Sequence, residues 1–221
     1  MALVKVVSGF IDIPGHPRGP ADYKALGEQL VTAIEPHEGL IFDSDQQTVG
    51  TTWLAQYLKS VPNVAHSIGD NPEKNTMAYH CVQHEKFAWL SAAAKADMAD
   101  IYVWIDYGIL HVPGVTAAVI QKFLTRIEDY GQAVVMPGCW PKADVKHQNP
   151  CWRFCGGLIA VPRALVQLFT RAAMGIAVRQ IMTTRNVEWE VNTLARLEQH
   201  DQVPIMWYQS DHNETMFEAL P

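Results

Sequence analysis

Residues 99–111 combine a continuous apolar run with polar residues on either side. β-Branched and aromatic side chains fill positions Ile101 to Ile105, a pattern typical of a central parallel strand covered on both faces. Asp106 follows directly, and because a carboxylate inside an apolar sheet is costly, we expect it at the strand's carboxyl end. Open α/β sheets bind ligands at that end. The alternative is an Asp that caps a turn before Gly108.

The remaining pattern alternates short apolar segments with segments of helical periodicity, which predicts an α/β fold with a mostly parallel central sheet flanked by helices. Asp22 and Asn71 stand where N-caps are expected, and Pro72 suits a first helical position. Strands are predicted at 3–13, 39–43, 61–68, 132–137, 155–162 and 203–208, and helices at 22–34, 51–58, 71–94, 117–130, 163–174 and after residue 192.

In the helix predicted after Asn71, Tyr79, Lys86 and Leu90 share one face. A lysine on a face that otherwise turns inward either extends its amine to solvent or meets an anion. Lys86 is therefore a candidate ligand-binding residue.

The 221 residues are enough for one large domain or two small ones, and we interpret 1–221 as a single domain. A formal charge of −6 gives no general attraction to nucleic acid or to anionic membranes. The amino-terminal residues lack the charged and apolar regions of a signal peptide, and no segment is apolar enough to span a membrane. We therefore expect a cytoplasmic protein.

Four cysteines are present, and in that compartment thiols or metal ligands are expected rather than disulfides. Cys139, His147, Cys151 and Cys155 resemble a zinc knuckle, although the first spacing is long. Apolar neighbours such as Phe154 favour simple burial of the thiols, so we expect no structural zinc there.

The sequence lacks three common catalytic motifs: the phosphate-binding loop of P-loop enzymes, the glycine fingerprint of Rossmann dehydrogenases and the Gly-x-Ser-x-Gly nucleophile elbow of α/β-hydrolases. The remaining chemistry is a hard cation that bridges Asp106 and a diphosphate. His212, in the polar segment after the last strand, is a candidate second ligand. Glu188 and Glu190 flank Trp189, and an acid beside an indole suits sugar binding, although a solvated acid at a helix start is an equal alternative.

Several segments together resemble the HtrL/YibB family, bacterial glycosyltransferase-like proteins of the GT-A fold. The most specific are Asn71-Pro72-Glu73-Lys74-Asn75-Thr76 and Trp104-Ile105-Asp106-Tyr107-Gly108-Ile109; Val7 to Ile13, Cys155-Gly156-Gly157, Glu190-Val191-Asn192 and Asp211-His212-Asn213 occur in the family's order. The resemblance implies a single GT-A-like domain that transfers a sugar from a nucleotide-diphosphate sugar.

The same resemblance implies roles for individual residues. Asp106 takes the first place of the Asp-x-Asp motif, and Gly108 stands where the second carboxylate is expected. Asp106 and His212 would bind Mn²⁺ or Mg²⁺, and Glu190 with Asp106 would be catalytic. The donor residues would be Ser8, Phe10, Asp43, Lys74, Lys86, Asp106 and Gly108, and the residues that contact the sugar or acceptor would be Gly156, Gly157 and Trp189.

The acceptor implied is a surface polysaccharide or lipopolysaccharide, with a hydroxymethylated DNA base as the alternative. The acidic charge disfavours DNA, because DNA contact usually needs a basic surface. Gly108 keeps open a further alternative, a nucleotide-sugar-binding module without transfer activity.

Overall fold

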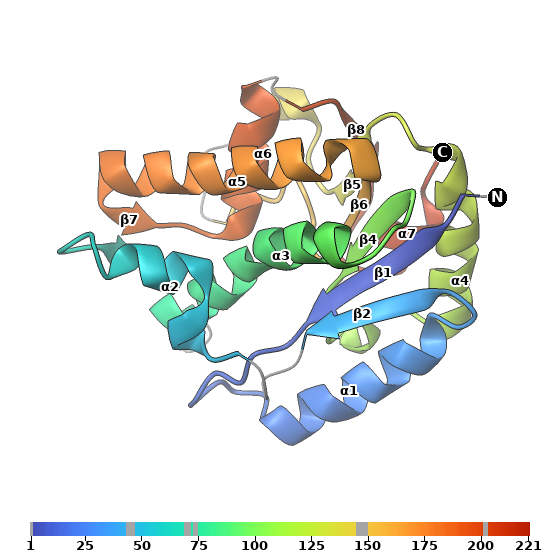
Figure 1. Cartoon of the computed structure of the whole chain (residues 1–221), viewed down its shortest axis with the longest axis horizontal. Coiled ribbons are helices and arrows are strands. Elements are labelled where there is room, and N and C mark those ends of the chain that lie inside the picture. The colour runs from blue at the N-terminus through green and yellow to red at the C-terminus, as the bar shows by residue number, and fades with distance from the viewer. Residues whose placement is uncertain (1, 43–46, 69–71, 73–74, 145–149, 201–202) are drawn as a thin grey trace.

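A computed structural model of the chain describes residues 2–42, 47–68, 72, 75–144, 150–200 and 203–221 (Figure 1). A six-stranded sheet in the order β2-β1-β4-β6-β5-β8 forms its centre. β6 is antiparallel to both of its neighbours and the other pairs are parallel, which confirms the predicted mostly parallel sheet. The strands are β1 (Val4–Gly9), β2 (Glu38–Phe42), β4 (Ile101–Ile105), β5 (Val134–Gly138), β6 (Leu158–Pro162) and β8 (Ile205–Gln209).

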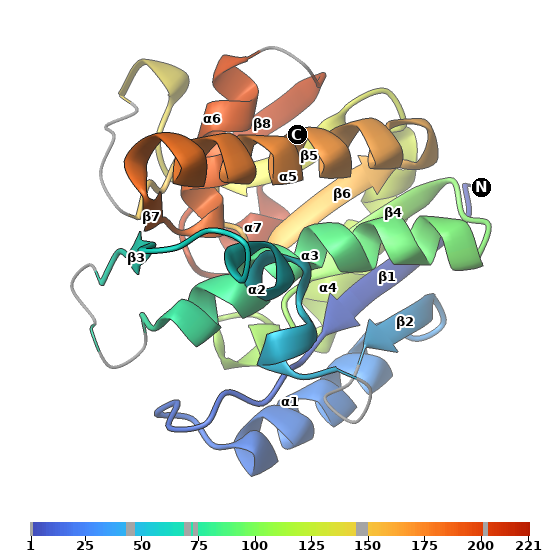
Figure 2. The ribbon, with the colours of Figure 1, turned by 60° about the vertical axis from the view of Figure 1, so that its left-hand side comes forward.

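Helices cover both faces of this sheet. Those in the described residues are α1 (Pro20–Ala33), α2 (Trp53–Leu58), α3 (Met77–Ala96), α4 (Ala117–Arg126), α5 (Arg163–Thr184), α6 (Glu190–Gln199) and α7 (Thr215–Glu218). Figures 1 and 2 show α3 and α5 side by side across one face, with α1 and α4 on the other. No helix within the described ranges has both the length and the apolar character that crossing a membrane requires.

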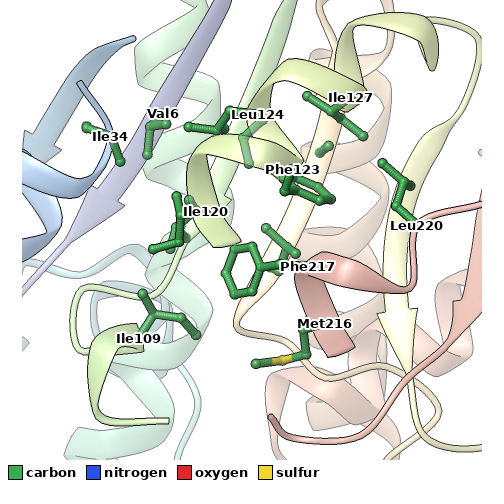
Figure 3. Packing of buried hydrophobic residues seen from close by; sticks show 14 of the residues in the cluster. Val6, Ile34, Ile109, Ile120, Phe123, Leu124, Ile127, Met216, Phe217 and Leu220 are labelled. Carbon is green, nitrogen blue, oxygen red and sulfur yellow. The ribbon is translucent and has the colours of Figure 1, made fainter. Parts of the chain in front are cut away.

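Side chains of β4 alternate between two hydrophobic cores, one on each face of the sheet. Val103 packs into the core beneath α1, α4 and α7, and Trp104 packs into the core beneath α3, α5 and α6. Figure 3 shows the first core, in which Phe123 of α4 meets Phe217 of α7 edge to face with ring centroids 5.6 Å apart. This burial on both sides explains why β4 reads as a continuous apolar run.

Two predicted helix starts are wrong. α1 begins at Pro20 after Gly19, so Asp22 lies inside the first turn; proline is favoured at that first position because its missing N–H has no helical partner there. α3 begins at Met77, where the Thr76 hydroxyl accepts a hydrogen bond from the Tyr79 amide at 3.2 Å. Asn71, the predicted cap, lies outside the described residues.

Two other elements differ in extent from the prediction. The strand predicted at 61–68 reduces to β3 (Ala65–His66), which pairs with β7 (Asn186–Val187) in a separate two-stranded sheet. α5 continues past the predicted end at residue 174 to Thr184, because Gly175 is accommodated within the helix. Arg185 then ends α5 in the left-handed conformation, with φ of 53°.

Candidate functional site

A cavity of about 510 Å³ opens where β1 and β4 end. β6 is antiparallel to β4, so the residues that precede it lie beside the residues that follow β4. Gly9, Asp106 and Gly157 line the cavity from these three places, and the Asp106 amide donates to the Gly157 carbonyl at 2.9 Å. The volume is within the range of small-molecule sites. Asp106 thus lies at the carboxyl end of β4, as predicted, and lines the cavity; its role in ligand binding stays a prediction.

A buried ammonium joins two carboxylates at the wall of this cavity. Lys86 of α3 is 1% exposed, and its Nζ lies 3.0 Å from Glu190 Oε1 and 3.4 Å from Asp106 Oδ1. The same Nζ donates to the Gly156 carbonyl at 2.9 Å. The Trp104 indole N–H also donates to Asp106 Oδ1, at 2.7 Å. Lys86 therefore fixes the two acids in place, with all three of its N–H donors directed at protein oxygens.

The carboxylates of Asp106 and Glu190 raise the pKa values of two neighbouring side chains, Lys86 and Tyr79. Burial alone lowers the pKa of Lys86, but the carboxylates of Asp106 and Glu190 outweigh burial and raise that pKa above its usual value. Burial, followed by the charges of Glu190 and Asp106, raises the pKa of Tyr79 well above its usual value. Lys86 is therefore a cation and Tyr79 a neutral phenol at neutral pH.

Glu190 presents one oxygen that the described residues leave without a hydrogen-bond partner. Its side chain is 4% exposed, and Oε2 is the buried atom that lacks a partner. An unsatisfied buried carboxylate oxygen is costly, which makes it a candidate acceptor for a ligand hydroxyl. Glu190 begins α6, where the helix dipole favours a negative charge.

The paired glycines allow this arrangement. Gly156 has φ of 71°, and a Cβ there would lie 2.6 Å from Glu190 Oε1, so both the backbone and the space demand glycine. A Cβ on Gly157 would lie 3.4 Å from Asp106 Oδ2. The Gly156 carbonyl accepts the hydrogen bond from Lys86, and Gly157 lines the cavity beside Asp106.

Aromatic rings form two groups along the cavity. Phe10 stacks on Tyr23 and on Tyr107, with centroid distances of 5.2 and 5.4 Å. Trp189 meets Tyr79 edge-on at 5.2 Å and Trp152 at 5.8 Å. Flat rings of this kind suit a nucleobase or the C–H face of a sugar.

A cationic side chain stands beside the first group of rings. The Arg18 guanidinium lies 5.3 Å from the Tyr23 ring centroid, and Arg18 lines the cavity. It is carried by the Pro/Gly-rich segment between β1 and α1, which directs it toward this end of the sheet. Arg18 is therefore placed to meet an anionic part of a ligand.

The structure brings most of the sequence-predicted residues to one place. Those that line the cavity are Phe10, Lys86, Asp106, Gly108, Gly157, Trp189, Glu190 and His212. Ser8 is fully buried and does not line it, because its hydroxyl donates to the Ile105 carbonyl at 2.7 Å and holds β1 against β4. Asp43, Lys74 and His147 lie outside the described residues. Glu188 instead pairs with Arg196 at 2.8 Å.

Sequence reasoning missed Arg18, Tyr23, Trp104 and Trp152 as members of the site. Trp104 belongs to an apolar run, and only the path of the chain shows that its N–H reaches Asp106. Tyr79 carried a usable signal, because it shares a helical face with Lys86. Arg18 follows the segment Val7 to Ile13, which resembles the HtrL/YibB family.

The predicted cation ligands Asp106 and His212 both line the cavity, but they belong to different local groups of side chains. His212 reaches the same cavity, yet its Nδ1 lies 3.5 Å from Cys139 Sγ. Within the described ranges, the one cluster of three acidic, thiol or imidazole ligands is Cys139, Cys155 and His212. The Lys86 ammonium lies 3.4 Å from Asp106 Oδ1. The divalent cation between Asp106 and His212 therefore stays a prediction, and we derive no step through it.

Comparison with known proteins shows the fold. No protein-family model matches the chain, and no curated protein matches it in sequence. A glycosyltransferase involved in glycosylation of the major capsid of PBCV-1 superposes with a TM-score of 0.56 at 11% identity, covering 94% of this chain and 81% of that one. A CMP:2-keto-3-deoxy-manno-octonic acid synthetase solved with CTP gives 0.39 at 9% identity, covering 97% and 95%. The first likeness confirms the predicted GT-A-like fold; the HtrL/YibB resemblance stays a prediction.

Proposed function

We propose that the protein is a glycosyltransferase that takes its sugar from a nucleotide-diphosphate donor bound in this cavity. The observation that carries the proposal is the Lys86–Asp106–Glu190 cluster, with Glu190 Oε2 buried and unsatisfied by the described residues. The fold shared with a glycosyltransferase supports it. Ligands of α/β sheets bind at the strand ends where this cluster lies.

The nucleotide part of the donor is assigned to the first aromatic group and to the cationic side chain beside it. Phe10 and Tyr107 offer flat surfaces for the nucleobase, and Arg18 is the candidate partner of the diphosphate. Asp106 accepts hydrogen bonds from hydroxyl groups of the donor. A divalent cation carried in by the diphosphate belongs to the donor, and the test below includes it.

The transfer step breaks the bond between the anomeric carbon and the diphosphate oxygen and forms a bond to an acceptor hydroxyl oxygen. Negative charge develops on the leaving diphosphate, and Arg18, together with the field of the Lys86 ammonium, stabilises that charge. Glu190 Oε2 takes the proton of the reacting hydroxyl as a base; if Glu190 instead binds a hydroxyl of the transferring sugar, the leaving diphosphate oxygen takes that proton. Trp189, beside Glu190, stacks on the sugar.

The acceptor is a hydroxyl-bearing molecule, and we favour a glycan over a modified DNA base. The chain carries a formal charge of −6, which disfavours DNA. A salt-sensitive mobility shift of hydroxymethylated DNA would contradict the glycan assignment.

The proposal is tested by thermal unfolding in a panel of nucleoside diphosphates and nucleotide sugars, each with EDTA and with Mn²⁺. One nucleotide series should raise the unfolding temperature, and the matching nucleotide sugar should release free sugar or nucleoside diphosphate on incubation. Stabilisation without any turnover would instead support a nucleotide-sugar-binding module. No stabilisation by any member of the panel would contradict both.

A further inference from the structure

Three side chains from separate segments meet beside the cavity. Cys139 follows β5, Cys155 precedes β6 and His212 follows β8. Their ligand atoms all lie within 4.8 Å of one another. Cys139 Sγ is 3.9 Å from Cys155 Sγ and 3.5 Å from His212 Nδ1. The proposed transfer reaction assigns no role to either thiol.

We propose that Cys139, Cys155 and His212 bind one thiolate-preferring metal ion of the Zn²⁺ class. Zinc–sulfur bonds of about 2.3 Å at a tetrahedral angle place two sulfurs about 3.8 Å apart, and a sulfur and an imidazole nitrogen about 3.6 Å apart. The two distances in the structure match these edges within about 0.1 Å. Two thiolates and one imidazole are soft and borderline ligands, which disfavour Mg²⁺ and Mn²⁺.

The backbone holds the three ligands in position. The Cys155 amide donates to the Pro137 carbonyl at 2.9 Å, and the Ser210 amide donates to the Gly138 carbonyl at 3.0 Å. These bonds join the ends of β5, β6 and β8 on either side of the cluster. The ligands are thereby brought together by the sheet rather than by one flexible loop.

Neighbouring side chains support the ligands. The Ser210 hydroxyl lies 3.4 Å from Cys155 Sγ. The His212 ring packs edge-on against Trp152, with centroids 4.3 Å apart. Such outer contacts orient metal ligands and strengthen binding.

The open position of this ion faces the cavity. Cys155 and His212 both line the cavity, and Cys155 is buried whereas His212 is exposed. Three protein ligands with one position left for water or a ligand atom are typical of reactive zinc sites rather than closed structural ones. The ion would thus place a Lewis acid at the wall of the cavity, where we assign no other protein-bound metal ion.

This set differs from the zinc knuckle suggested by the spacing. Cys151 is outside the cluster, since its backbone amide donates to the Asn192 side chain and its thiol is buried elsewhere. His147 lies outside the described residues. A Cys139–Cys155 disulfide is the rival, and it requires the sulfurs to approach from 3.9 Å to about 2.05 Å.

The test is titration of the reduced, metal-free full chain with Co²⁺. We expect about one equivalent to bind, with the thiolate charge-transfer and intense visible bands of tetrahedral cobalt, and Zn²⁺ to displace it. Cys139→Ser and His212→Ala should weaken or remove these bands, and Cys151→Ser, the matched control, should retain them. Circular dichroism checks that each variant is folded.

Zn²⁺ should also raise the unfolding temperature of the wild type more than that of Cys139→Ser, a readout independent of the cobalt spectrum. Cobalt bands that persist in both cluster variants, or vanish only in Cys151→Ser, would overturn the proposal. So would a wild-type chain that shows no thiolate–cobalt band, or whose purified form holds Cys139 and Cys155 as a disulfide that reduction does not convert into a metal-binding pair.

Discussion

Lys86 Nζ lies 3.0 Å from Glu190 Oε1, and both side chains are buried although 104 positions separate them in the chain. The pair joins the middle of α3 to the first residue of α6 across the wall of the cavity. A buried ion pair contributes little net stability compared with apolar side chains, because desolvation opposes the attraction. Its position favours a functional reason for the pair.

Removal of Lys86 alone should destabilise the fold. Lys86→Met leaves Glu190 buried beside Asp106 without a compensating cation, which costs about 3–5 kcal/mol in the free energy of unfolding. The double variant Lys86→Met/Glu190→Gln should recover most of that loss, because no unpaired buried charge remains. Urea denaturation of the wild type, Lys86→Met, Glu190→Gln and the double variant measures the coupling between the two residues. Losses of unfolding free energy in the single variants that simply add in the double variant would contradict this coupling.

Asp106→Asn should weaken donor binding without unfolding the protein. The Asn oxygen can still accept from the Trp104 indole and from Lys86, so the geometry survives while the negative charge is lost. We expect affinity for the stabilising nucleotide sugar to fall at least about tenfold in calorimetry. Unchanged affinity in both EDTA and Mn²⁺ would return Asp106 to the role of a turn cap.

Arg18→Met should weaken the binding of a nucleoside diphosphate more than the binding of the corresponding nucleoside. The substitution keeps the apolar stem beside Tyr23 and removes the charge that we assign to the diphosphate. About a tenfold loss for the diphosphate is expected. Arg179→Met, on the outer face of α5, is the control and should bind normally. Equal losses of affinity for the nucleoside and for the diphosphate would contradict the assignment of Arg18 to the diphosphate.

The stability of the protein should fall as the pH is lowered from 6.5, the usual histidine value. Burial lowers the pKa of His80 to about 4 and that of His84 to about 3. Below pH 6.5 these two histidines are therefore protonated in the unfolded chain while they stay neutral in the folded chain. Burial raises the pKa of Glu85 from 4.5 to about 7, which acts in the opposite direction. For these three groups the net difference is one proton between pH 4.5 and 6.5, or about 1.4 kcal/mol per pH unit.

Two variants separate these contributions. Glu85→Gln should steepen the decline to about 2.7 kcal/mol per pH unit, because the opposing group is gone. His84→Gln should make the slope nearly flat. Denaturant unfolding at several pH values measures both slopes, and variants that keep the wild-type slope would contradict the assignment.

Local pattern was sufficient for the six strands of the central sheet and for the place of Asp106, although it also predicted a longer strand at 61–68. β4 is apolar on both faces because each face carries its own core, and this is visible in five consecutive residues. The predicted start of α3 was wrong because Asn71-Pro72 has the sequence pattern of an N-cap followed by a first helical residue. The N-cap in the structure is Thr76, whose hydroxyl accepts the capping hydrogen bond.

The partners of site residues were not visible in the sequence. Lys86 was expected near an anion, yet the residues that meet it come from β4 and α6, and only the tertiary path shows this. Ser8 looked like a donor ligand, but its hydroxyl is consumed by a β4 carbonyl. The metal site predicted for His212 and Asp106 stays a prediction, and the contact of the His212 imidazole with the Cys139 thiol, which follows β5, was not visible in the sequence.

The most direct test is turnover of the stabilising nucleotide sugar by the wild type, Glu190→Gln and Glu188→Gln. Glu188 pairs with Arg196 away from the cavity, so its variant is the matched control. We predict that Glu190→Gln binds the donor like the wild type and releases nucleoside diphosphate at least about 100-fold more slowly. Glu188→Gln should stay within about threefold of the wild-type rate, since Glu188 contacts no reacting group. Equal rates in Glu190→Gln and the wild type would contradict the assignment of this cavity as a glycosyl-transfer site.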